Sequence, residues 1–195
     1  MEGIIKFEAT NVSSETISEK EFALINPWRQ QSYDNGYIGV ANDGIGYGNI
    51  SFRSGTDNEF IISASATGEI AKLKGSDYSR VINFDIAKNS LQCQGPKLAS
   101  SESLSHAAIY KANKAVKAVL HIHNIELWER LINKTPTTPL EAEYGTQAMA
   151  NAISSIVKNS ESGNGIIIMA GHKEGIISYG SSLENCISSI NKFIL

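Results

Sequence analysis

The sequence predicts an α/β protein in which helices cover the faces of a mainly antiparallel sheet. Short apolar runs rich in β-branched residues alternate along the chain with amphipathic segments of helical period. Several of these runs follow one another through short turns. Short turns join antiparallel neighbours, because a parallel crossover needs a dozen or more residues. The pattern therefore disfavours a doubly wound parallel sheet.

The first part of the chain predicts one helix followed by strands. Residues 14–31 place apolar side chains among charged ones at helical spacing. Four runs with strand character follow, at residues 37–40, 49–53, 59–65 and 81–86. Glycines 44, 46 and 48 lie between the first two runs. Their spacing differs from the dinucleotide-binding pattern G-x-G-x-x-G, so they favour a turn, and a loop that binds a small anion is the alternative.

The second part of the chain predicts three helices and three strands. The expected helices cover residues 101–114, 144–158 and 182–193. The expected strands cover residues 118–123, 165–170 and 175–180. The last two strands are close enough in sequence to pair as a hairpin. The run from Gly165 to Ala170 carries no charge, which is typical of a buried strand.

Length, charge and cysteine content limit the classes of protein that fit. A chain of 195 residues predicts one domain, residues 1–195, with a sizeable core. A net charge of −3 and an isoelectric point of about 5.8 argue against a protein that binds nucleic acid through a basic surface. No apolar run reaches the roughly 18 residues of a membrane span, and no signal-peptide pattern is visible, so we expect a cytoplasmic protein. Cys93 and Cys186 predict no disulfide framework.

The chain has four histidines, and they give the clearest functional signal: His106, His121, His123 and His172. His121 and His123 are two residues apart in an expected strand, so their side chains share a face and can bind one metal ion. Neutral imidazole, the form a metal ligand needs, dominates at pH 7 when its pKa is unperturbed. His172, at the end of another expected strand, can add a third ligand and leave a fourth position open. The alternative is a chance pair of histidines on a polar strand face.

Glu102 follows Ser100 and Ser101 at the start of an expected helix, and two interpretations stay open. A serine N-cap and a glutamate in the first turn both stabilise a helix start. Alternatively, the free backbone N–H groups and the two hydroxyls can bind an anion such as phosphate. His106 lies four residues after Glu102 on the same helix face. It is more typical of a packed histidine than of a ligand.

Taken together, these segments resemble the class II aldolase/adducin family. They are Gly48-Asn49-Ile50-Ser51, Ala66-Thr67-Gly68, Ser100-Ser101-Glu102, His121-Ile122-His123 and Gly171-His172. The resemblance covers residues 22–187, and its most specific part is Ser-Ser-Glu followed by His-x-His. Residues 63–68 depart from the family's usual Thr-Pro-Ser-Gly type of segment. The resemblance implies a three-layer α/β/α sandwich with a mainly antiparallel central sheet, in an uncharacterised branch related to fuculose phosphate aldolase.

The resemblance also implies a metal-dependent lyase that cleaves a small ketose phosphate, or a related hydroxy-carbonyl compound, through a metal-stabilised enediolate. Its metal ligands would be His121, His123 and His172, holding Zn²⁺ or another divalent transition metal. Its catalytic residues would be Glu102, as acid or base, and Tyr144, offered to a neighbouring subunit of a homotetramer. Its phosphate-binding residues would be Asn49, Thr67, Gly68, Ser100 and Ser101.

Two alternatives to an aldolase stay open. A sugar-phosphate dehydratase or epimerase would start from the same metal-stabilised chemistry. A non-enzymatic interaction module would be similar to the head domain of adducin, but adducin-like domains lack the complete histidine set that this chain has. If the protein is an enzyme, its expected partner is a small sugar phosphate, and we expect it to bind neither nucleic acid nor a membrane.

Overall fold

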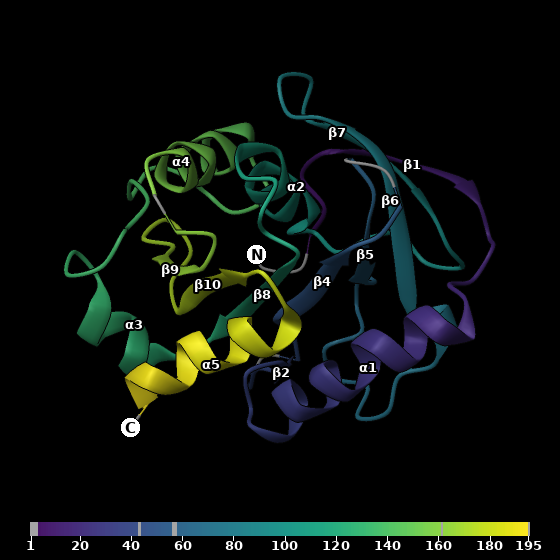
Figure 1. Cartoon of the computed structure of the whole chain (residues 1–195), viewed down its shortest axis with the longest axis horizontal. Helices are drawn as coiled ribbons and strands as arrows, with labels where there is room; N and C mark the ends of the chain where they lie inside the picture. The colour runs from purple at the N-terminus through teal and green to yellow at the C-terminus, as the bar shows by residue number, and fades with distance from the viewer. Residues whose placement is uncertain (1–3, 43, 56–57, 161, 195) are drawn as a thin grey trace.

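The fold is built on an eight-stranded sheet. The computed structural model describes residues 4–42, 44–55, 58–160 and 162–194. The strand order is β1-β7-β6-β5-β4-β8-β10-β9 (Figure 1). These strands are β1 (Glu8–Ser13), β4 (Asn49–Arg53), β5 (Phe60–Ser63), β6 (Tyr78–Asp85), β7 (Ser90–Gln94), β8 (Ala118–His123), β9 (Gly165–Ile168) and β10 (Gly175–Gly180). Every pair is antiparallel except β1 with β7, which confirms the predicted mainly antiparallel sheet.

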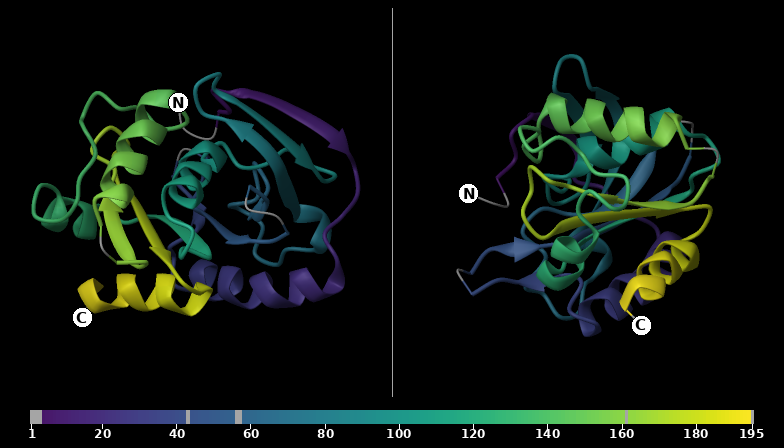
Figure 2. Two further views of the ribbon diagram at one scale, coloured as in Figure 1. Left: turned by 45° about the horizontal axis from the view of Figure 1, so that its top comes forward. Right: turned by 90° about the vertical axis from the view of Figure 1, so that its left-hand side faces the viewer.

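Helices lie on both faces of this sheet. They are α1 (Glu19–Asp34), α2 (Ser103–Ala112), α3 (Ile125–Leu131), α4 (Gln147–Lys158) and α5 (Leu183–Ile194), with a short 3-10 helix η1 (Gly75–Asp77). Helices α2 and α4 pack on one face, and α1 and α5 lie together on the other (Figure 2). A further short pair, β2 (Gly39–Val40) and β3 (Gly46–Tyr47), forms a separate sheet. The predicted three-layer α/β/α arrangement is therefore confirmed.

Two apolar cores separate the three layers. The first joins the sheet to α2 and α4 and includes Val119 and Met149. The second joins the opposite face to α1 and α5 and includes Leu120 and Ile187. Burial of apolar side chains on both faces is what holds the sheet between the two helical layers. Among the helices of the described residues, none is long and apolar enough to cross a bilayer.

Five elements escape the sequence patterns: β1, β3, β7, α3 and η1. Strand β1 lies at the sheet edge with four of its six side chains exposed, so it carries no apolar alternation. Strand β7 buries only Leu91 and Cys93, and helix α3 has only seven residues. Periodicity needs a longer or more apolar segment to reveal an element.

Strand β8 determines where the candidate site lies. It is paired on both sides, with β4 and with β10, so it runs through the interior of the sheet. Alternate side chains point to opposite faces. Val119 packs in the core beneath α2 and α4, whereas Leu120 and Ile122 pack in the other core. His121 and His123 share the face of Val119 and therefore point toward the layer of α2 and α4.

The start of α1 is tied to the sheet by a partly buried ion pair. Ser18 and Glu21 form a reciprocal capping box, and Arg80 of β6 lies 2.6 Å from the Glu21 carboxylate. Burial raises the pKa of Glu21, but hydrogen bonds from Arg80, Ser18 and Ser54 outweigh burial and bring it to about 2. The ionised carboxylate is thus specifically stabilised in the folded state.

We expect the Glu21 ion pair to make the free energy of unfolding depend on pH. Because the folded pKa is lower than the ordinary value of 4.5, its contribution is complete above pH 4.5 and is lost as the pH falls toward 2. At pH 7 the Glu21→Gln variant should be less stable than the wild type by about 1–2 kcal/mol. That gap should close between pH 5 and 2, measured by urea unfolding. Glu19→Gln, an exposed change in the same helical turn, serves as control, and a gap that persists at pH 2 would contradict the assignment.

Candidate metal centre

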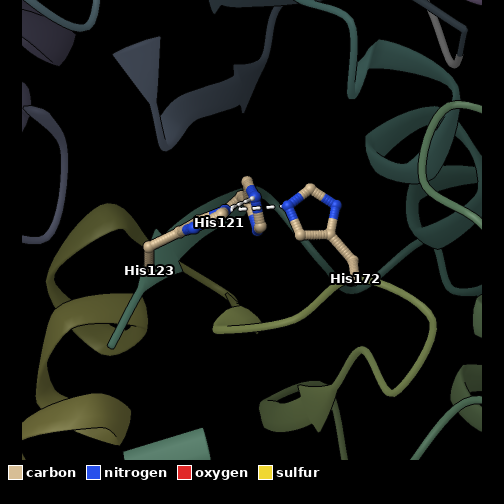
Figure 3. Close-up of side chains that lie close together, drawn as sticks. All are labelled: His121, His123 and His172. Carbon is tan, nitrogen blue, oxygen red and sulfur yellow. Dashed lines mark hydrogen bonds between the residues drawn. The ribbon is translucent and has the colours of Figure 1, made fainter. Parts of the chain in front are cut away.

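Three imidazoles from two segments of the chain meet at one point. His121 and His123 come from β8, and His172 comes from the turn between β9 and β10 (Figure 3). The Nε2 atom of His123 lies 3.2 Å from Nε2 of His121 and 2.8 Å from Nε2 of His172. One ligand nitrogen from each ring lies within 4.8 Å of the others. Nitrogens on one tetrahedral zinc ion are about 3.3 Å apart, since each Zn–N bond is about 2.0–2.1 Å. The three histidines therefore fit a divalent transition metal.

The turn from Met169 to Gly175 fixes the position of His172. The N–H of His172 donates to the carbonyl of Met169, and the N–H of Gly175 donates to the carbonyl of His172. A side chain at position 171 would overlap the carbonyl oxygen of Ala142, so only glycine fits there. Antiparallel pairing of β9 and β10 then brings the turn beside the end of β8.

The second nitrogen of each ring faces an oxygen. Nδ1 of His121 lies 3.3 Å from the carbonyl oxygen of Ile176. Nδ1 of His172 lies 3.6 Å from Oε1 of Glu102, and Nδ1 of His123 lies 4.0 Å from Oε2 of Glu174. These oxygens favour a proton on Nδ1 and leave the Nε2 lone pairs directed at the shared point.

Electrostatics also favour an uncharged His121 ring. Burial lowers the pKa of His121 well below 6.5, and the neighbouring His123 and His172 lower it further. A neutral imidazole is the form that binds a metal ion. Two aromatic rings help to hold the cluster: Tyr47 stacks on His123 with ring centroids 5.2 Å apart, and Tyr144 meets His172 edge to face at 4.8 Å.

Glu102 is buried beside the histidines. It is the N-cap residue of α2, and only 2% of its surface is exposed. Ser105 donates a hydrogen bond of 2.8 Å to Oε2. The expected serine N-cap is therefore wrong, because the helix begins at Ser103 and the Glu102 side chain makes no capping hydrogen bond. The carboxylate instead turns toward Nδ1 of His172, the ring nitrogen that does not point at His123.

A cavity of about 220 Å³ opens next to the histidines and gathers most of the predicted site residues. His121, His172, Glu102 and Tyr144 line one part of it. The predicted phosphate-binding residues also line it: Asn49, Thr67, Gly68, Ser100 and Ser101. His123 joins the group through its contacts with the other two histidines. The structure thus brings all ten predicted residues to one place, and their individual roles stay predictions.

The polar groups of this cavity differ in what they can offer a ligand. Asn49 is buried on β4 opposite His121, and its Oδ1 has no hydrogen-bond partner within the described ranges. The Thr67 hydroxyl donates to the carbonyl of Ala64 at 2.7 Å, so its proton is already used. In this conformation Thr67 can donate to an anion only through its backbone N–H.

Two residues near the histidines were not found by sequence reasoning. Tyr47 belongs to the glycine-rich segment that predicted a turn or a small-anion loop, and its ring stacks on His123. Glu174 follows His172 by two residues and has a positive φ of 70°. A carboxylate close in sequence to a candidate ligand was the available signal for Glu174, whereas the contact of Tyr47 depends on tertiary structure.

His106 packs behind the site. Its Nδ1 lies 2.7 Å from the Ser51 hydroxyl, which is 2.8 Å from the Tyr110 hydroxyl, and all three residues are buried. Burial lowers the pKa of His106 to about 3, so the ring is neutral at pH 7. These contacts favour the interpretation of His106 as a packed side chain.

Comparison with known proteins agrees with this fold. Residues 42–129 match the model of the class II aldolase and adducin N-terminal domain. The fold is similar to that of YgbL, a putative aldolase/epimerase/decarboxylase from Klebsiella pneumoniae, at 18% identity and TM-score 0.65, covering 90% of this chain and 86% of that one. It is also similar to that of L-fuculose-1-phosphate aldolase from Thermus thermophilus, at 16% identity and TM-score 0.62. That match covers 91% of this chain and 89% of the aldolase. No curated protein matches the chain.

The sandwich architecture is the fold of class II aldolases, and the histidine cluster gives it a candidate metal centre. A third solved structure, the N-terminal class II aldolase domain of a conserved protein from Thermoplasma acidophilum, covers 95% of this chain and 99% of its own at 12% identity and TM-score 0.57. The chain therefore has a fold similar to that of class II aldolases, and its residues 42–129 match the model of the class II aldolase and adducin N-terminal domain.

Proposed function

We propose that the protein is a metal-dependent lyase of the aldolase type that cleaves a small ketose phosphate or a related hydroxy-carbonyl compound. The observation that carries the proposal is the convergence of three buried imidazole nitrogens within 4.8 Å, beside a cavity that also contains a buried carboxylate. Three neutral ligands with room for substrate are typical of catalytic rather than structural zinc sites. Zn²⁺ is the expected ion, although imidazole also suits other transition metals.

The proposed chemistry depends on stabilising negative charge. A divalent ion, when bound, would supply a Lewis acid that stabilises the negative charge developed in retro-aldol cleavage. Neutral His121, His123 and His172 would hold it without cancelling its positive charge. Glu102 is the proposed acid or base, and the Ser105 hydroxyl holds its Oε2 atom so that the carboxylate stays oriented.

The rest of the cavity supports a phosphorylated substrate. Ser100, Ser101 and Asn49 bring side-chain donors to one wall, and Thr67 and Gly68 bring backbone N–H groups. Tyr144, whose ring lies against His172 of its own chain, stays a proposed catalytic residue, and its use by a neighbouring subunit stays part of the proposal. A homotetramer in the cytoplasm, as the family resemblance implies, stays part of the proposal.

The proposal is tested by metal content and by turnover. Purified protein is supplied with Zn²⁺, Mn²⁺ or Fe²⁺ and assayed on a panel of ketose phosphates and unphosphorylated ketoses. We expect about one equivalent of metal per chain and cleavage that requires it. Less than about a tenth of an equivalent after zinc supplementation would contradict the metal site. Removal of the ion with a chelator should abolish turnover, and adding it back should restore it.

Product analysis separates the related reactions. Cleavage gives two smaller carbonyl compounds, dehydration gives a product lighter by one water, and epimerisation leaves the mass unchanged. All three would use the same histidines, so a dehydratase or epimerase is the second candidate. An interaction module like adducin is disfavoured by the complete set of three histidines.

A further inference from the structure

A buried arginine reaches the wall of the cavity from the opposite side of the sheet. Arg29 lies in α1, a helix of the layer that faces away from the histidine side chains. Only 1% of its surface is exposed. Burying a guanidinium is costly unless an anion or several hydrogen-bond acceptors compensate for the lost water. The groups that contact Arg29 must therefore compensate for the water that its guanidinium loses on burial.

The guanidinium contacts one loop. Its Nη2 donates to the carbonyl of Thr67 at 2.8 Å, and its Nη1 donates to the carbonyl of Ala71 at 3.3 Å. Its plane lies over the ring of Tyr33, 4.8 Å from the centroid. Among the residues that the structure describes, no carboxylate lies within 4.0 Å of its nitrogens, and Nε has no partner. The positive charge is thus balanced by carbonyl dipoles and not by a neighbouring acid.

The two acids whose charges act on Arg29 from a distance, Asp77 and Asp34, are hydrogen-bonded to other residues. Asp77 is held by Lys97 at 2.9 Å and by the backbone of Lys74, and Asp34 accepts from Gln30. Burial lowers the pKa of Arg29, yet a guanidinium stays protonated in proteins. The protein therefore keeps a full positive charge directly behind the segment that carries Thr67 and Gly68.

The acceptor of Arg29 belongs to a peptide group whose other end faces the cavity. The carbonyl of Thr67 and the N–H of Gly68 form one trans peptide, so they point in opposite directions. Arg29 holds the carbonyl end, and Gly68 lines the cavity. In the described part of the chain, the Gly68 N–H has no acceptor. Hydrogen bonds in a chain polarise one another, so a charged donor on the carbonyl strengthens the N–H at the other end.

The backbone geometry of residues 66–68 also favours the binding of an anion by their N–H groups. Ala66 adopts a positive φ of 56°, and successive N–H groups around such a residue form a concavity that binds anions. A side chain at position 68 would overlap the carbonyl oxygen of Gly39, so the loop packs closely against β2 and cannot easily shift. The Thr67 hydroxyl is already committed to Ala64, which leaves the backbone as the donor.

We propose that Arg29 is a positioning residue for the phosphate group of the substrate, fixing the 67–68 peptide and transmitting its positive charge through that peptide to the Gly68 N–H. The inference rests on the proposed function, since it assigns the phosphate end of the same cavity. It predicts that charge at position 29 matters more than hydrogen bonding alone. It also predicts that the effect depends on the phosphate group and not on the metal.

The test compares Arg29→Lys with Arg29→Gln in the full-length, metal-loaded protein. Lysine keeps the charge, whereas glutamine keeps a donor without the charge. Inorganic phosphate is the probe, and its dissociation constant is measured by titration calorimetry. Ser32→Ala is the matched control, because Ser32 is equally buried in α1 and, among the described residues, its hydroxyl donates to the carbonyl of Trp28 and to no part of the 67–71 loop. Metal content and thermal unfolding are recorded for every variant.

We expect Arg29→Gln to bind phosphate at least tenfold more weakly, and Arg29→Lys and Ser32→Ala to stay within about threefold of the wild type. In turnover, Arg29→Gln should raise KM for a phosphorylated ketose and leave kcat and metal content near wild-type values. For an unphosphorylated ketose, Arg29→Gln should leave both KM and kcat at wild-type values.

Three results would overturn the inference. Arg29→Gln with wild-type phosphate affinity removes Arg29 from the phosphate site and leaves the proposed lyase intact. Equal weakening in both variants shows that the charge plays no part. Wild-type protein that cleaves unphosphorylated ketoses and binds no phosphate overturns both this inference and the proposed substrate class, but not the metal-dependent reaction. If Arg29→Gln does not fold, Arg29→Lys decides: retained phosphate binding supports the inference and its loss overturns it.

Discussion

The Glu102→Gln variant should bind metal as the wild type does and turn over about 10²–10⁴ times more slowly. Glutamine has the shape of glutamate and can still accept from the Ser105 hydroxyl, so the buried site should keep its packing. It can neither accept nor release a proton. The measurement is kcat with a phosphorylated ketose, together with metal content of the same sample.

The position of Glu102 gives this experiment a second possible result. Because Oε1 lies 3.6 Å from Nδ1 of His172, the carboxylate is also placed to orient that ring. Loss of a group that orients a metal ligand typically lowers metal affinity by 10–100-fold. If Glu102→Gln loses metal in that range and regains full turnover at saturating metal, Glu102 orients His172 and does not transfer the proton. Glu174→Gln, which changes a more exposed carboxylate 4.0 Å from His123, is the matched control.

The second large effect is expected from the histidines themselves. His121→Ala and His123→Ala should each reduce bound metal to below about a tenth of an equivalent and abolish turnover, because two remaining imidazoles hold a divalent ion weakly. Wild-type protein should also gain thermal stability when zinc is added, by about 2.7 kcal/mol at a hundredfold excess over the dissociation constant. Neither variant should show that gain.

His106→Gln is the control for these variants. His106 is as buried as His121 and lies on α2, outside the cluster whose nitrogens converge. We expect it to keep one equivalent of metal and the zinc-dependent gain in stability. If it loses metal as completely as His121→Ala does, the effect reports damage to the core and not removal of a ligand.

The sequence predicted the layers of this fold more reliably than its edges. The apolar runs at β8, β9 and β10 are long enough to show strand character, and the turn between β9 and β10 is short enough to require a hairpin. Edge strand β1 is mostly exposed and α3 is short, so neither leaves a periodic signal. Chain composition alone cannot show which strand pairs with which, and the sheet order comes from the structure.

The relative positions of site residues could be predicted from the sequence where those residues lie in one secondary-structure element. His121 and His123 had to share a face because a strand alternates. His172 meets them only because β10 pairs with both β8 and β9, which no local pattern reveals. Glu102 could equally have been a first-turn glutamate that only stabilises the helix start, and its burial beside His172 came from the structure. Arg29 gave no signal at all, since its partners are backbone carbonyls about 40 residues away in sequence.

The three histidines differ in how firmly the chain holds them. Two stand on a strand with hydrogen-bonded neighbours on either side, and amide protons there should exchange with solvent only when much of the sheet opens. The third stands on a short turn, where local opening is far less costly. An ion bound at the cluster would therefore escape by way of His172, and its residence time would follow the motions of residues 169–175 and not the lifetime of the folded protein.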